Sequence, residues 1–115
     1  GATDFTLTSQ IVSNTLSRTT DASTLAVGVS WNGNALNKTT PVTMIDTANN
    51  ISAGLDALAV ATAFAGADRV STQGSFDFTV DSATSDGSTA AKFKDLTDGY
   101  WSGDVRVQFN AVWTI

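Results

Sequence analysis

The chain has 115 residues, of which 42% are hydrophobic and only 15% are charged, and its net charge at pH 7 is −5. This length fits one domain with a single core, and the apolar content is too high for a disordered chain. The negative charge argues against a nucleic-acid partner, because phosphate binding requires clustered Lys and Arg. The sequence therefore predicts one globular domain over residues 1–115.

Several kinds of active site are excluded because the chain contains neither His nor Cys. Ser-His-Asp and Cys-His arrangements need these residues, and so do the usual zinc sites. Paired carboxylates for glycoside hydrolysis remain an alternative, since Asp77, Asp81 and Asp86 lie close in sequence. Asp at strand ends and in turns usually accepts hydrogen bonds from backbone amides, and we expect that role here. The sequence thus predicts no catalytic residue, no metal and no cofactor.

Apolar and polar residues alternate in three runs of the first half of the chain, which is typical of half-buried strands. These runs cover residues 5–12, 25–31 and 42–45, and Ile11-Val12 either extends or bulges the first. Asn32-Gly33 follows the second run and predicts a type I′ hairpin turn into a short return strand.

The second half of the chain contains segments of different character. Residues 76–80 alternate as a further strand, whereas residues 50–65 are rich in Ala. A short helix and an irregular crossover both remain open for 50–65. One helical turn is expected within residues 90–97, over the end of the sandwich. Short strands separated by turn residues predict an all-β, antiparallel β-sandwich.

Residues 104–115 form the longest strand that the pattern predicts. Its odd positions are apolar and its even positions are polar apart from Val112, so one face is expected to be buried. We expect the core to contain Val105, Val107, Phe109, Trp113 and Phe78. Large aromatics usually anchor packing, so Trp31 and Tyr100-Trp101 are also expected inside rather than exposed for sugar stacking.

The segment from Tyr100 to Thr114, YWSGDVRVQFNAVWT, closely resembles the C-terminal strand of the common-pilus major pilins of Escherichia coli, a family of chaperone–usher fimbrial subunits. Met44–Asn49 is a second specific match. Weaker similarity at Leu7–Ser9, Asn14–Leu16 and Val27–Val29 extends the resemblance through nearly the whole chain.

This resemblance implies an immunoglobulin-like fold that lacks its final strand and is completed by donor-strand exchange or swapping. It implies neighbouring pilin subunits, a periplasmic chaperone and an outer-membrane usher as partners, with a host-cell receptor as a further one. It also implies an extracellular location in a fimbria, reached through the periplasm. The subunit-binding residues would then be Val105, Val107, Phe109, Ala111 and Trp113.

Family members carry a long N-terminal portion with the donor strand and the first strands of the sandwich. The resemblance places Gly1 well inside the family's domain, so we expect either a truncated chain or missing strands supplied by another chain. Unpaired buried polar groups cost about 1–3 kcal/mol each, so we expect a second polypeptide or a swapped strand along Val105–Trp113.

Two functions follow as hypotheses. The first is a structural, non-enzymatic pilus subunit that supports adhesion and biofilm formation. The alternative is a monomeric carbohydrate-binding adhesin that uses exposed aromatic and Asp side chains.

Overall fold

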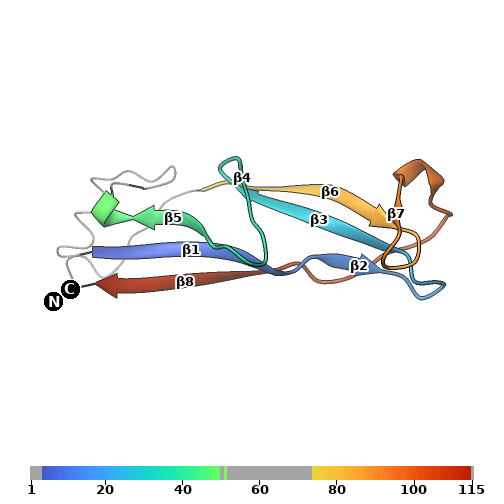
Figure 1. Ribbon diagram of the computed structural model, residues 1–115, viewed down its shortest axis with the longest axis horizontal. Coiled ribbons are helices and arrows are strands. Elements are labelled where there is room, and N and C mark those ends of the chain that lie inside the picture. The colour runs from blue at the N-terminus through green and yellow to red at the C-terminus, as the bar shows by residue number, and fades with distance from the viewer. Residues whose placement is uncertain (1–3, 50, 52–73, 115) are drawn as a thin grey trace.

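The computed structural model describes residues 4–49, 51 and 74–114 (Figure 1). These residues form two antiparallel sheets and two short 3₁₀ turns in an immunoglobulin-like, all-β arrangement, as predicted. Within this part of the chain, no helix has the length and apolar character needed to span a membrane. Nearly all of the segment 50–65, with its two alternatives of helix and crossover, lies outside the described residues.

The first sheet has three strands in the order β5-β1-β8. β1 (Asp4–Ser13) lies in the centre, with β5 (Val42–Asp46) on one side and β8 (Arg106–Thr114) on the other. β1 continues through the predicted extension, and its register against β8 shifts between Ile11 and Ser13. The extra residue there makes a bulge, so the chain both extends and bulges at this point.

The second sheet has the order β2-β3-β6-β7, and the short β4 also pairs with β3. Asn32 and Gly33 connect β3 to β4 with φ angles of 45° and 82°, which confirms the predicted hairpin turn. β6 runs past residue 80 and is longer than the pattern predicted. The strands are β2 (Thr15–Ser17), β3 (Thr24–Trp31), β4 (Asn34–Ala35), β6 (Phe76–Thr84) and β7 (Ala90–Ala91).

The two sheets are staggered along the long axis of the molecule, which measures 56 × 22 × 21 Å. Figure 1 shows the first sheet towards the end where β1 begins and β8 ends, and the second sheet towards the other end. β1 and β2 follow each other almost in line but belong to different sheets. Asn14 lies at this change of sheet, where its side-chain amide donates to the Val27 carbonyl and its own carbonyl accepts from the Val27 amide, both at 2.9 Å.

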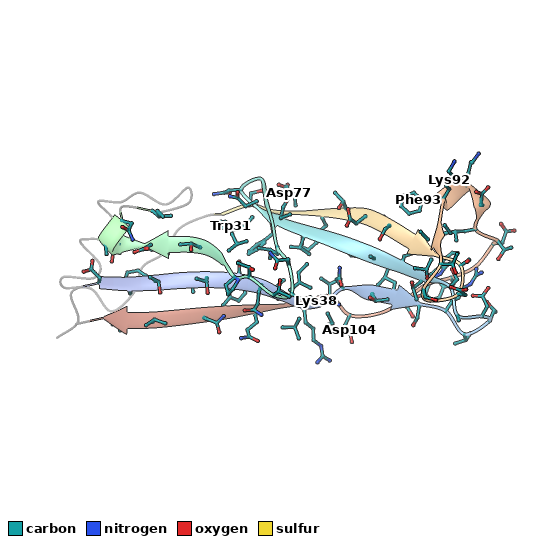
Figure 2. The ribbon with its side chains drawn as sticks, in the orientation of Figure 1. Trp31, Lys38, Asp77, Lys92, Phe93 and Asp104 are labelled. Atoms are coloured by element: carbon teal, nitrogen blue, oxygen red, sulfur yellow. The ribbon has the colours of Figure 1, made fainter. Side chains whose placement is uncertain are left out.

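The core runs from the overlap of the two sheets along the first sheet, where Phe5, Met44 and Ile45 lie on β1 and β5. Trp31 is only 5% exposed, lies near the middle of the molecule (Figure 2) and packs against Phe76 with ring centroids 4.7 Å apart. The expectation of a buried Trp31 is confirmed. The buried apolar cluster consists of Phe5, Ile11, Val29, Trp31, Leu36, Met44 and Ile45.

Two short 3₁₀ turns occupy opposite ends of the molecule. η1 (Thr47–Asn49) follows β5, and η2 (Phe93–Asp95) confirms the single helical turn expected within 90–97. Phe93 is 52% exposed, so this turn does not bury its aromatic side chain (Figure 2).

Candidate functional site

The last strand is paired on one edge. β8 pairs with β1 from Asp4↔Thr114 to Ser13↔Arg106. Among the described residues, no strand pairs with its opposite edge. An edge strand of nine residues carries a row of backbone amides and carbonyls that can accept another strand.

The predicted direction of the side chains on β8 is confirmed. Val105 and Val107 are half-buried against the core cluster, whereas Arg106 and Gln108 are exposed. The predicted register is therefore right.

The predicted burial is wrong for three aromatic residues that face inwards. Phe109 is 51% exposed, Trp113 is 60% exposed and Phe78 is 65% exposed. Ala111, between the first two, is also exposed. Alternation fixes the face on which a side chain lies, but burial also requires a neighbouring strand and an opposing layer over that face. Among the described residues, β8 has no neighbour on one edge.

β6 also has an edge that lacks a described strand partner over most of its length. It pairs with β3 along its length, but on its other edge the only described partner is β7, at Ala83 and Thr84. Val80 is 55% exposed, like Phe78 two residues before it. We call Phe78, Val80, Phe109 and Trp113 the uncovered apolar set. The alternation of apolar and polar residues along β6 placed Phe78 and Val80 on the inner face. Nothing in the neighbouring sequence indicated that these two side chains would be exposed.

Aromatic contacts connect two members of the uncovered apolar set, Phe109 and Trp113, to the core. Phe109 meets Phe76 edge to face at 6.0 Å, and Phe76 packs on the buried Trp31. Trp113 stacks on the buried Phe5 at 5.2 Å. Phe109 and Trp113 thus lie at the margin of the core and are not isolated surface residues.

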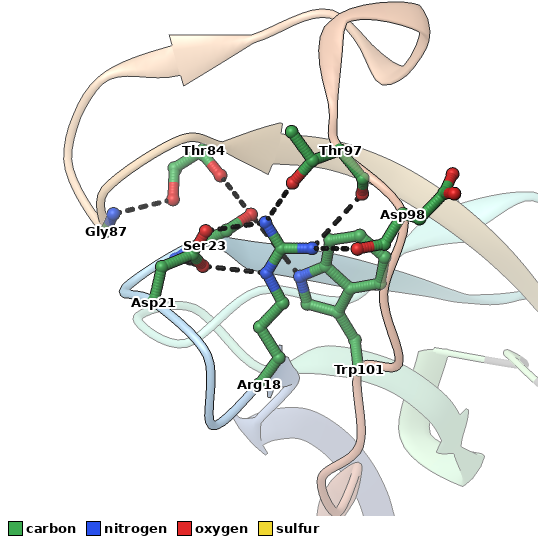
Figure 3. Close-up of polar contacts among 8 residues, drawn as sticks. All are labelled: Arg18, Asp21, Ser23, Thr84, Gly87, Thr97, Asp98 and Trp101. Carbon is green, nitrogen blue, oxygen red and sulfur yellow. Dashed lines mark hydrogen bonds and ion pairs between the residues drawn. The ribbon is translucent and has the colours of Figure 1, made fainter.

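A polar cluster around Arg18 holds the far end of the molecule together (Figure 3). The guanidinium donates to both Asp21 carboxylate oxygens at 2.7 and 2.6 Å. It also donates to the carbonyls of Thr97 and Asp98 and to the Thr97 hydroxyl, and it lies 4.3 Å from the centre of the Trp101 ring. The hydrogen bond from Arg18 lowers the pKa of Asp21. Every guanidinium N–H has a protein acceptor, so the cluster is structural.

Exposed aromatics lie at both ends of the part of the chain that the structure describes. Trp101 is half-buried in the Arg18 cluster, where its indole N–H donates to the Ser23 hydroxyl at 3.3 Å. Tyr100 beside it is 81% exposed, so the expectation of a buried Tyr100 is wrong. Trp113 stacks on Phe5, where β8 ends and β1 begins. This end of β8 lies at the opposite end of the long axis from β7 (Figure 1). Tyr100 and Trp113, two of the most exposed described aromatics, are therefore too far apart to hold one sugar together.

Asp86 has the capping role predicted for it. Its carboxylate accepts from the amides of Thr89 (2.7 Å) and Ser88 (3.0 Å) and from both of their hydroxyls. These bonds, that from the Thr89 amide first, lower the pKa of Asp86 to about 2. The carboxylate thus holds its own turn together, whereas Asp77 and Asp81 lie on β6.

A cavity of about 150 Å³ lies beside the change of sheet at Asn14. Ile11, Val29 and Leu36 supply apolar walls, and Asp81 is the one ionisable residue among the lining residues that the structure describes. A single carboxylate offers neither a nucleophile–base pair nor a metal ligand set. The open edge of β8, with the uncovered apolar set beside it, is therefore the candidate site.

Comparison with known proteins gives the family. The model of the fimbrillin MatB family matches residues 1–113. The chain belongs to this fimbrillin family. It is a family of structural pilus subunits, which agrees with the resemblance seen in the C-terminal strand.

Curated relatives of this fimbrillin carry the name common pilus major fimbrillin subunit EcpA. The chain is 47% identical to the one from Klebsiella pneumoniae subsp. pneumoniae and 45% identical to the one from Escherichia coli O139:H28. Each match covers 98% of this chain and 58% of the relative. A Shigella boydii relative is 45% identical, with 54% of its length covered. The chain thus spans little more than half the length of these relatives.

Proposed function

We propose that this fimbrillin chain is the strand-accepting part of a pilus subunit, and that a neighbouring subunit donates an extended strand along the open edge of β8. The donated strand would hydrogen-bond to β8 and place alternate apolar side chains against Val105, Val107, Phe109, Ala111 and Trp113. The role is structural rather than enzymatic. The subunit would be secreted through the periplasm with a chaperone and an usher, and it would serve adhesion and biofilm formation in an extracellular fimbria.

The observation that carries the proposal is that β8 combines an uncovered inner face with an edge that has no strand partner among the described residues. Phe109 and Trp113 lie on core-facing positions, yet more than half of each is exposed. Addition of one strand satisfies the backbone of β8 and covers these rings at the same time. The uncovered apolar side chains of β6 supply a second surface for the same insertion.

The test uses synthetic peptides of about 15 residues, a length that exceeds the nine residues of β8. They are tiled across the part of the Klebsiella pneumoniae relative that this chain does not match. One region should raise the melting temperature of the chain, because its peptides bind the folded form only. The same peptides should slow hydrogen exchange at alternate amides of β8.

Phe109→Ser and Gln108→Ser form a matched pair on this strand. Phe109 faces inwards and Gln108 faces solvent, so only Phe109→Ser should weaken peptide binding, by about tenfold or more. Equal loss in both variants, or no stabilising peptide from any region, would refute strand acceptance at β8.

A further inference from the structure

We propose that, without a donated strand, two copies of this chain pair edge to edge through β8, antiparallel and two-fold symmetric about Asn110. The partner is a second copy, and the result is a continuous six-stranded sheet in the order β5-β1-β8-β8-β1-β5. This pairing competes with the proposed donor strand for the same edge, but its argument does not depend on the existence of that donor.

The length of β8 selects the register. The strand runs from Arg106 to Thr114, so its midpoint is Asn110. An antiparallel pair centred there brings all nine residues of each strand into the ladder. Every other centre leaves residues unpaired at the strand ends, and each unpaired residue loses ladder hydrogen bonds.

The inner face is self-complementary in this register. Phe109 of each copy lies directly opposite Ala111 of the other, and Val107 lies opposite Trp113. Each large ring thus faces a smaller side chain, and directly opposite side chains are close enough to pack. Moving the centre to residue 109 or 111 would instead place Phe109 against its own copy or against Trp113. The exposed halves of Phe109 and Trp113 would be covered by this pairing.

The outer face places no like charges together. Arg106 lies opposite Thr114, Gln108 opposite Val112, and Asn110 opposite its own copy. Arg106 is the only charged residue on β8, and it is at the far end from its copy. Although the chain carries a net charge of −5, pairing along this edge therefore brings no two charges of the same sign into contact.

The stagger of the sheets also permits the pairing. The second sheet extends past β8 towards one end of the molecule (Figure 1). A two-fold axis through the midpoint of β8 directs the second sheets of the two copies to opposite ends. A closed, isologous dimer results.

Single-cysteine variants test the register, because the natural chain has no Cys. Asn110→Cys should form a disulfide-linked dimer in air, since opposite residues of antiparallel strands have Cα atoms about 4.5–5.5 Å apart. Gln108→Cys and Val112→Cys are matched controls on the same face. Each lies about 14 Å from its own copy, so neither should cross-link alone. A mixture of the two should give the heterodimer. A pattern centred elsewhere, or equal rates for all three, would overturn the proposal.

Asn110→Asp supplies a second test by sedimentation velocity. It places two carboxylates face to face on the axis, so dimerisation should weaken by about tenfold or more at low salt and recover partly in about 1 M NaCl. Gln108→Asp, opposite Val112, should have a smaller effect. Far-UV circular dichroism confirms that both variants are folded. Wild-type monomers at high concentration, or equal effects of the two variants, would contradict the proposal.

Strand donation and symmetric pairing predict different results for the same variant. Asn110→Asp should still bind the stabilising peptide, because a donated strand places no second carboxylate at the axis. Peptide binding without dimerisation would overturn the symmetric pairing and leave strand donation intact. Dimerisation without any peptide binding would overturn strand donation and leave the symmetric pairing intact.

Discussion

Trp31 and Trp113 occupy inward-facing positions on different strands, yet Trp31 is 5% exposed and Trp113 is 60% exposed. Trp31 packs on Phe76 under the overlap of the two sheets, and Trp113 stacks on Phe5 at the margin of the core. The difference in exposure between the two rings therefore shows that the core is covered at Trp31 and only partly covered at Trp113.

Truncation of each ring should give different costs in urea unfolding of the isolated chain. Trp31→Ala should lower the free energy of unfolding by about 3–5 kcal/mol, as expected for a fully buried ring. Trp113→Ala should cost about 1–2 kcal/mol, because only the stacked part of its ring is lost from the interior. Equal costs would mean that a partner covers Trp113 in solution, and sedimentation at the same concentration would show it.

Asp86 gives the chain a defined acid sensitivity. Its turn bonds lower its folded-state pKa to about 2, below the value of about 3.9 in an unfolded chain. Its stabilisation is therefore complete above about pH 4 and is lost as the pH falls through about 2. Asp86→Ala should be less stable than wild type at pH 7, and the difference should shrink between pH 4 and pH 2. A difference that does not change with pH would exclude a role for the ionised carboxylate.

At the scale of elements, the change of sheet between β1 and β2 depends on Asn14. Both hydrogen bonds at this point join Asn14 to Val27, one from the side chain and one from the backbone. This attachment fixes where the chain leaves the first sheet and enters the second.

Asn14→Ala should lower the free energy of unfolding by about 1–2 kcal/mol, because the partly buried Val27 carbonyl loses its side-chain donor. Asn49→Ala, at an exposed residue that donates to Asp46, is the control and should change stability by less than about 0.5 kcal/mol. The measurement is urea unfolding of both variants. Similar values for the two would show that the backbone bond alone sets the change of sheet.

The edges of β6 and β8 share one cause of exposure. Each strand has an inner apolar face and an edge without a described strand partner over most of its length. Long apolar edges promote association with other chains. The edge of β8 would accept either a strand donated by a neighbouring subunit or β8 of a second copy.

At the scale of the whole molecule, the stagger of the sheets produces an elongated shape. The radius of gyration is 18.5 Å, compared with about 13 Å for a compact domain of this length. The two sheets overlap in the middle of the molecule, and the ends of each sheet extend beyond the overlap (Figure 1). A subunit of this shape exposes inner-face side chains even though its strands are regular.

The amino-acid sequence by itself determined the longer strands, the hairpin at Asn32-Gly33 and the face on which each side chain of β8 lies, but not the short strands β2 and β7. These features depend on local alternation and turn chemistry, which are written in neighbouring residues. Only the tertiary structure decided that Phe78, Phe109 and Trp113 are exposed, because burial depends on which strands lie alongside and opposite. The Arg18 cluster could not be predicted from the sequence either, because it joins residues that are 79 positions apart in the chain. Alternation specifies a direction for each side chain, whereas coverage is a property of the assembled sheets.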